Sequence, residues 1–421
     1  MTQRANQSKM IERTPFYYGW MILISATVGL FLTMPGQTAG ISVFLEQIIA
    51  SLEIPRTTVS LLYLLGTLGG ALTLTLIGRA IDLFGPRKAV AVIAVMFAGG
   101  CFLMSAATGP LMLLFGLTLI RAFGQGGLPL VSIHTVNLWF VRRRGLAVGV
   151  AGLGVALGTA VFPPLIELLM GAYGWRTAYA LLGGLIVVTV LPLGLAFFRE
   201  HPEHYGLLPD GGAPAEAVRR EADEPSLTLG QARRTLTFWL YVLGGVSVSA
   251  LGTGLVFHHY AIMEANGVER AAAAAMFVSF GLVMAASNLA TGLAMDRVPP
   301  RYLLSLNLAL LVTCLLTASS IGSPGLVVVY GIFIGGMQGM HSALQAGVYA
   351  HYFGRRHAGA VRGFATTIFV GGTAAGPYLF ALGFDLMERQ EATLWAWAAL
   401  PVLVGAAAPF LKPVPRRHES D

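Results

Sequence analysis

GRAIDLFGPRK, residues 78–88, says more about the fold class than any other stretch, because it gathers four charged side chains between two long apolar runs. The chain of 421 residues is 55% hydrophobic and only 11% charged, so such a cluster stands out. A second stretch, GLAMDRVPPR at 292–301, places glycine, aspartate and arginine at one constant offset from the first. A charged stretch that recurs at a fixed offset predicts an internal repeat.

Apolar runs of about 18 residues or more recur along nearly the whole chain, and a run of that length is typical of a membrane-spanning helix. Their hydrophobicity comes in blocks rather than in alternation, which favours helices over a transmembrane barrel. The sequence therefore predicts an all-α polytopic membrane protein. We expect twelve helices, at 18–43, 58–78, 89–108, 111–137, 146–170, 175–198, 237–263, 271–294, 302–321, 325–350, 362–384 and 393–411.

The net charge of +7 is not spread evenly along this topology. Most arginines and lysines fall in the two terminal segments and in every second turn, and this bias predicts that both termini are cytoplasmic. The basic balance therefore indicates a lipid bilayer as partner, not a nucleic acid. We expect no signal peptide. Three lysines against twenty-four arginines suggest a GC-rich microbe, which favours a bacterial inner membrane.

The longest polar stretch, 199–236, is rich in proline, glycine, alanine and charge, which is typical of a linker. It predicts three parts: a six-helix half at 1–198, a cytoplasmic linker at 199–236 and a six-helix half at 237–421. Further pairs share nearly the same offset, AFGQGG at 122 with GGMQGM at 335, and WFVRR at 139 with YFGRR at 352. Two parallel six-helix repeats are an architecture of secondary transporters, with the solute site where the repeats meet.

The repeated charged turn predicts a cytoplasmic gate. Aspartates there could accept hydrogen bonds from a helix N-terminus or an arginine across the two halves. The alternative is positive-inside charge on a tight turn, which explains the arginines but neither the aspartates nor the duplication. The predicted gate residues are Gly78, Asp82, Arg87, Gly292, Asp296 and Arg301.

GRAIDLFGPRK resembles the helix 2–3 signature of the major facilitator superfamily, with Leu83 and Pro86 in place of two basic residues. Other strings resemble the branch of bacterial monocarboxylate-transporter-like and oxalate/formate-exchanger-like proteins: YGW at 18–20, GISVF at 40–44, WFVRRRGLAVG at 139–149, YGLLPDG at 205–211 and YFGRRHAGAVRG at 352–363. The resemblance implies transport of a small organic anion. Monocarboxylate carriers hold the carboxylate with a lysine and an arginine, whereas this chain has Ala39 and Asn288 at those positions.

Arg121 lies well inside the predicted helix 111–137, where a charge is costly and usually faces a cavity or a partner. It could bind a carboxylate through two hydrogen bonds, or act on a nearby proton carrier. The alternative is a structural pairing within the bundle, for example with Glu167 or with a helix carbonyl.

Histidine titrates in the range that proton coupling requires. The candidates are His258 and His259, of which only one can point inward, and His341. Buried histidines that merely bond within the bundle are the alternative for each. The resemblance implies that the first, fourth, seventh and tenth helices line the cavity, which favours these three.

Glutamines recur in the same helices. We expect Gln37, Gln125 and Gln338 to line the solute site together with Arg121 and His341. Buried glutamines need partners, and a solute with carboxylate or hydroxyl groups would supply them. Hydrogen bonding between helices is the alternative.

No phosphate loop, metal-ligand spacing or nucleophile–base pair is recognisable, so we expect neither an enzyme nor a cofactor. The sequence predicts a monomeric secondary transporter that moves a small organic anion with a proton by alternating access. Proton-driven export of an amphipathic compound is the second hypothesis. A transporter-like sensor that signals through 199–236 is the third.

Overall fold

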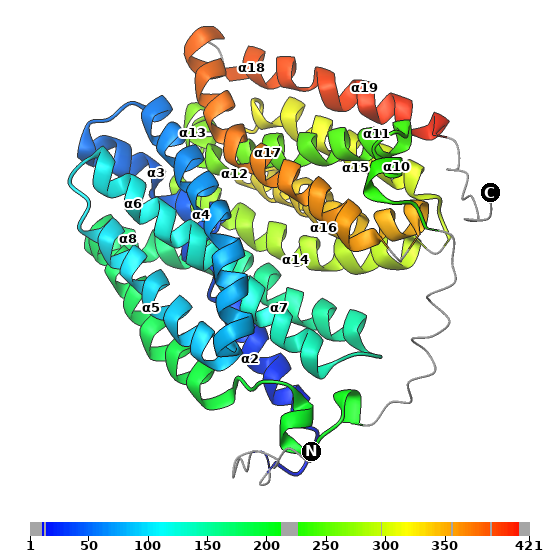
Figure 1. The fold of residues 1–421 in the computed structure, drawn as a ribbon. Coiled ribbons are helices and arrows are strands. Elements are labelled where there is room, and N and C mark those ends of the chain that lie inside the picture. The colour runs from blue at the N-terminus through cyan, green and yellow to red at the C-terminus, as the bar shows by residue number, and fades with distance from the viewer. Residues whose placement is uncertain are drawn as a thin grey trace. The chain divides into compact units, whose positions relative to one another are not determined.

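The computed structural model describes residues 11, 14–211, 226–295, 297–354, 357–387 and 390–411, and all regular structure in these ranges is helical (Figure 1). Ten of the described helices are long and apolar enough to cross a membrane. One of them, α8 (Arg144–Phe197), is broken at Gly174, where φ is 78°, and so comprises two spans. Two shorter apolar helices form another span, which confirms the predicted twelve-helix fold class.

That additional span, helix 1, is interrupted. It consists of α2 (Gly19–Phe31), the 3₁₀ turn η1 (Met34–Gly36) and α3 (Thr38–Leu52). Pro35 cannot donate a backbone hydrogen bond and Gly36 lacks a Cβ, so the break lies where PGQ occurs in the sequence. Helices 2 and 3 are α4 (Arg56–Phe84) and α5 (Pro86–Ser105).

Helix 4 also departs from regular geometry. It runs through α6 (Pro110–Leu119), the π-helical segment η2 (Ile120–Gly127) and α7 (Leu128–Trp139). The two parts of α8 form helices 5 and 6. Two 3₁₀ turns, η3 (Pro202–Tyr205) and η4 (Pro209–Gly211), follow. Short π segments inside helices often mark functional positions.

The second set begins with the short α10 (Leu229–Ala232). Helix 7 then combines α11 (Leu236–Ser247), the π-helical η5 (Val248–Gly252), α12 (Thr253–Phe257) and α13 (His259–Ala265). Helices 8 to 11 are α14 (Arg270–Ala294), α15 (Pro300–Ala318), α16 (Pro324–Phe353) and α17 (Ala358–Met387). Helix 12 comprises α18 (Gln390–Trp397), α19 (Ala399–Ala407) and η6 (Ala408–Phe410).

The chain divides into two compact units. Unit 1 contains Met1–Ile54 and Leu65–Pro214, and unit 2 contains Pro55–Leu64 and Ala215–Asp421. The division in the centre of the chain falls within the segment 199–236. The first turns of α4 pack with unit 2 although the rest of this helix belongs to unit 1.

Glycine lets helices touch through their backbones inside each unit. In unit 2, α16 lies along α14 (Figure 1). A Cβ on the α16 glycines would collide with backbone carbonyls of α14, and these glycines are spaced by four: Gly331, Gly335 and Gly339. In unit 1, Gly154 and Gly158 of α8 fit in the same way against α2. Close contact of this kind holds helices together in a membrane, where the hydrophobic effect between helices is weak.

Gly376 of α17 provides a test of this packing. A Cβ there would meet the carbonyl of Ala250 in η5 closer than any real Cβ approaches, whereas a Cβ at Gly371 of the same helix meets open space. We expect Gly376→Ala to lower the unfolding temperature and the monodisperse fraction of purified protein, because α17 must shift. Gly371→Ala is the control and should be neutral or gain about 0.5–1 kcal/mol of helix propensity. Equal behaviour of the two variants would contradict this account.

Candidate functional site

In unit 1 the broken helix 1 packs against the π-helical segment of helix 4. A Cβ at Gly36 would lie 3.1 Å from the backbone nitrogen of Gln125 and nearer still to the carbonyl oxygen of Ile120. Glycine is therefore required at this position if the two irregular segments are to meet. The contact places helix 4's polar residues beside the exposed backbone of the break.

Arg121 is at the centre of this junction and is only 2% exposed. Its Nε donates to the hydroxyl of Thr67 on α4 at 3.0 Å, and its Nη1 donates to the carbonyl of Gly36 at 3.1 Å. The second bond is the pairing with a helix carbonyl that sequence reasoning left open. Arg121 thus ties helix 4 to helices 1 and 2 and sets a permanent positive charge inside unit 1.

Two predicted glutamines lie at the same junction. Gln37 follows η1 directly, has extended backbone and donates from Nε2 to the Thr33 hydroxyl at 3.5 Å. Gln125 lies one turn after Arg121, and both glutamine side chains are half-buried. The structure therefore brings Gln37, Arg121 and Gln125 together. Sequence reasoning missed Thr67, although its position as a polar residue in the apolar run of α4 was a usable signal.

In unit 2 a polar stripe follows one face of α16. Its members, Gln338, His341 and Gln345, are spaced by three and four residues and are half-buried. The amide of Gln338 lies near Gly252 in η5, and Gln345 lies over Gly245 in α11. The His341 ring meets the Phe369 ring edge-on at 6.0 Å. The stripe therefore runs along the glycine-bearing side of helix 7.

His258 and His259 are both fully buried. His258 Nε2 lies 2.8 Å from the carbonyl of Pro377, and His259 Nε2 lies 2.9 Å from the carbonyl of Ala273. Each geometry fits a neutral ring that donates from Nε2. Aromatic rings surround His258, namely Phe257, Phe380 and Phe384, so a positive charge on it would be poorly compensated. Both rings connect helices within unit 2.

The repeated arginines of the predicted gate make matching contacts inside their own units. Arg87 Nε donates to the carbonyl of Leu195 near the end of helix 6 at 2.7 Å. Arg301 Nη1 donates to the carbonyl of Leu411 just after helix 12 at 2.8 Å. Each arginine therefore joins the start of the third helix of its unit to the end of the sixth, where a cation is favoured by the helix dipole.

The other gate residues are less constrained. Asp82 is exposed, and it has no hydrogen-bond or ion-pair partner among the described residues. A Cβ at Gly78 or at Gly292 would meet open space, so neither glycine is required by packing within its unit. Asp296 lies outside the described residues. The gate stays a prediction.

Comparison with known proteins identifies the family of this chain. The sequence profile of the Major Facilitator Superfamily matches residues 21–377 and 247–420. The chain belongs to the major facilitator superfamily. Its members are transporters and not enzymes, which agrees with the sequence prediction.

Relatives within the superfamily include carriers of organic anions. The chain is 31% identical over 179 residues to monocarboxylate transporter 13 of Bos taurus, and 30% identical over 184 residues to the oxalate:formate antiporter of Oxalobacter formigenes. Each alignment covers 42% of this chain and 40% of the relative. The match thus spans less than half of these relatives, and it confirms the resemblance to the branch that the motifs indicated.

The fold is also that of a solved transporter. The crystal structure of a bacterial homologue of the human lysosomal transporter Spinster, in an inward-facing and occupied conformation, superposes with a TM-score of 0.71. The alignment covers 94% of this chain and 97% of the other, at 16% identity. At this identity the similarity concerns the fold alone.

The geometry of His258 predicts a structural role. His258→Phe keeps a ring among the aromatic neighbours but removes the bond to Pro377, so we expect a loss of about 0.5–1.5 kcal/mol in unfolding free energy. Thermal unfolding of purified protein measures this loss. The pH dependence of transport should remain that of the wild type. A folded His258→Phe protein whose transport no longer responds to pH would instead make His258 a proton carrier.

Proposed function

We propose that this protein is a proton-coupled transporter of a small organic anion of the monocarboxylate type. The observation that carries the proposal is the buried guanidinium of Arg121 at the junction between broken helix 1 and helix 4. A charge at this depth is retained against a high desolvation cost, and such residues are commonly functional. The names of the two organic-anion carriers among the relatives support the same substrate class.

The chemistry of the unit 1 junction suits a carboxylate. Guanidinium and carboxylate form short charge-assisted hydrogen bonds, and amide groups such as those of Gln37 and Gln125 can satisfy the remaining oxygen lone pairs. In this scheme Arg121 replaces the cationic anchors that Ala39 and Asn288 do not provide. The solute would then be held from helix 4.

Among the three candidate histidines we assign proton coupling to His341. His258 and His259 are fully buried and bound to backbone carbonyls, whereas His341 is half-buried and shares its stripe with Gln338 and Gln345. Of the three rings, only that of His341 is partly exposed and has no hydrogen bond to a backbone carbonyl among the described residues, so it is the one best placed to exchange a proton during a transport cycle.

The proposal also covers the protein's location and its mode of action. The protein works as a monomer in the cell inner membrane of a bacterium, with both termini cytoplasmic. Its two six-helix halves, 1–198 and 237–421, alternate access to the solute. Positive charge in the terminal segments and in every second turn supports this orientation.

Uptake into proteoliposomes tests the substrate class. Labelled lactate, pyruvate, formate and oxalate are offered with and without an inward proton gradient, and gradient-stimulated uptake of at least one is expected. Arg121→Ala should lower that uptake roughly 100-fold, because a charge-assisted contact to the solute is lost. Arg362→Ala removes an exposed arginine outside the predicted gate and solute site and is the control.

Arg121→Lys preserves the charge, so it keeps the test valid if the alanine variant fails to fold. It should fold and transport at an intermediate rate, because lysine cannot reproduce the planar fork. Wild-type uptake by a folded Arg121→Ala protein would end the assignment of Arg121. Absence of uptake of all four anions by the wild type would refute the substrate class.

His341→Gln tests the coupling residue. We expect uptake to continue down a solute gradient but to lose its stimulation by the proton gradient, because glutamine cannot titrate. His134→Gln, a half-buried histidine of helix 4, is the matched control and should retain the stimulation. Undiminished stimulation in His341→Gln would remove His341 from the coupling mechanism.

A second candidate function is proton-driven export of an amphipathic compound. The observation that favours it is the presence of Ala39 and Asn288 where monocarboxylate carriers have cations. Export from inverted vesicles of a fluorescent amphipathic cation, with none of the four anions transported, would support this alternative.

A further inference from the structure

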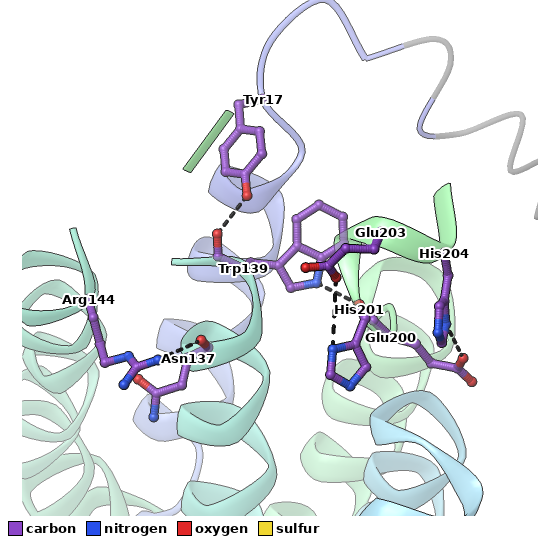
Figure 2. Close-up of polar contacts among 8 residues, drawn as sticks. All are labelled: Tyr17, Asn137, Trp139, Arg144, Glu200, His201, Glu203 and His204. Atoms are coloured by element: carbon purple, nitrogen blue, oxygen red, sulfur yellow. Dashed lines mark hydrogen bonds and ion pairs between the residues drawn. The ribbon is translucent and has the colours of Figure 1, made fainter. Parts of the chain in front are cut away.

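Residues 197–211 are packed onto the end of unit 1 at which helix 1 begins. The Tyr18 hydroxyl donates to the carbonyl of Phe197 at 3.0 Å, and the indole Nε1 of Trp139 donates to the carbonyl of Glu200 at 2.9 Å. The Tyr17 hydroxyl donates in turn to the carbonyl of Trp139 at 2.6 Å, so helix 1, helix 4 and this segment are linked (Figure 2).

Apolar side chains of the same segment complete the contact. Tyr205 and Leu207 pack against a buried cluster that includes Tyr18, Trp139 and Phe140. Burial raises the pKa of the Tyr205 phenol, against the opposing charge of Arg199. Two of the strings that resemble the anion-carrier branch, YGW and YGLLPDG, therefore lie in contact with a third, WFVRRRGLAVG.

Asp210 makes the most specific of these contacts. Its Oδ2 accepts from the backbone nitrogens of Val141, at 2.8 Å, and Arg142, and its Oδ1 accepts from that of Arg143 at 3.3 Å. One carboxylate thus binds three successive N–H groups of the turn between α7 and α8. Consecutive N–H groups form a concave site that favours an anion, and here the chain supplies its own.

Unit 2 binds the other end of the segment 199–236 at its equivalent turn. The backbone nitrogen of Leu227 donates to the carbonyl of Phe353 at 2.8 Å. Thr228 and Gln231 then form a capping box at the start of α10, and the Arg233 guanidinium lies 5.2 Å from the centre of the Phe364 ring. Phe353 belongs to YFGRR, the repeat of WFVRR in unit 1.

We propose that both ends of the central segment are docking elements, each fastened to the repeat-equivalent turn of its own unit, and that Asp210 positions the turn between α7 and α8. The described parts of this segment are therefore built into their own units, 199–211 into unit 1 and 226–236 into unit 2.

Hydrogen–deuterium exchange on the full-length protein in nanodiscs tests the docking. Asp210 has φ 54°, which glycine adopts without strain, so Asp210→Gly removes the carboxylate and spares the backbone. We expect the amides of 141–143 to exchange at least about tenfold faster, because each loses a bond to a charged acceptor. Glu203→Gln changes a carboxylate of the same segment that lies beside His201, 3.9 Å away, and should leave these amides unchanged.

Further variants sharpen this test. Asp210→Asn retains an acceptor oxygen and should give an intermediate exchange rate, which also guards against misfolding of the glycine variant. Thr228→Ala should accelerate exchange at 227–231 and leave 141–143 unaffected. Wild-type exchange at 141–143 in Asp210→Gly, or equal acceleration throughout unit 1, would overturn the proposal.

Transport gives a second readout, which rests on the proposed function. With the anion that the wild type takes up, Asp210→Gly should lower the maximal rate severalfold and leave KM unchanged, because Asp210 does not reach the Arg121 junction. A raised KM at an unchanged maximal rate would contradict a positioning role. If none of the four anions is transported, the proposed function fails, whereas the exchange data still decide the docking.

Discussion

Hydrocarbon offers no hydrogen-bond partner to a backbone amide or carbonyl, and the rest of this structure depends on that constraint. Every apolar run therefore closes its hydrogen bonds within a helix. Irregular backbone inside the spans is concentrated at a few places, among them η1, η2 and η5, and η1 packs directly against η2. The Gly36 carbonyl is bound by Arg121, so a deeply buried charge satisfies a group that the break of helix 1 releases. Both the helical fold and the contact of Arg121 with the Gly36 carbonyl therefore follow from the need to satisfy backbone hydrogen bonds in hydrocarbon.

The internal repeat shows which contacts belong to the scaffold. Arg87 and Arg301 occupy equivalent positions and bind equivalent carbonyls, so the arginines of the repeated turn contribute to each unit separately. Arg121 has no basic counterpart in helix 10, where the polar stripe of Gln338, His341 and Gln345 is found instead. Scaffold contacts are duplicated, whereas the polar chemistry differs between the units.

Much of the fold could be predicted because a run of about 20 apolar residues has few alternatives to a membrane helix. The break at Pro35 and Gly36 and the separation of α8 at Gly174 follow from local backbone chemistry that the sequence displays. Partner choice could not be predicted, since it depends on which helices pack together. The hydroxyl of Thr67, the carbonyl of Pro377 and the turn held by Asp210 lie far along the chain from the residues they bind. The burial of Arg121 could be predicted from its position deep in a span. The sequence suggested that only one of His258 and His259 points inward, whereas the structure buries both.

The Arg87 and Arg301 contacts also imply an order of assembly during synthesis. The start of helix 3 can be tied down once Leu195 has been made, so unit 1 can close most of its contacts while unit 2 is still on the ribosome. The start of helix 9 must wait for Leu411. The segment Pro55–Leu64 is made early but packs with unit 2, so the first turns of helix 2 remain without their final neighbours for most of translation. Membrane insertion of helix 2 must therefore be stable before its tertiary contacts exist, and its long apolar run provides for this.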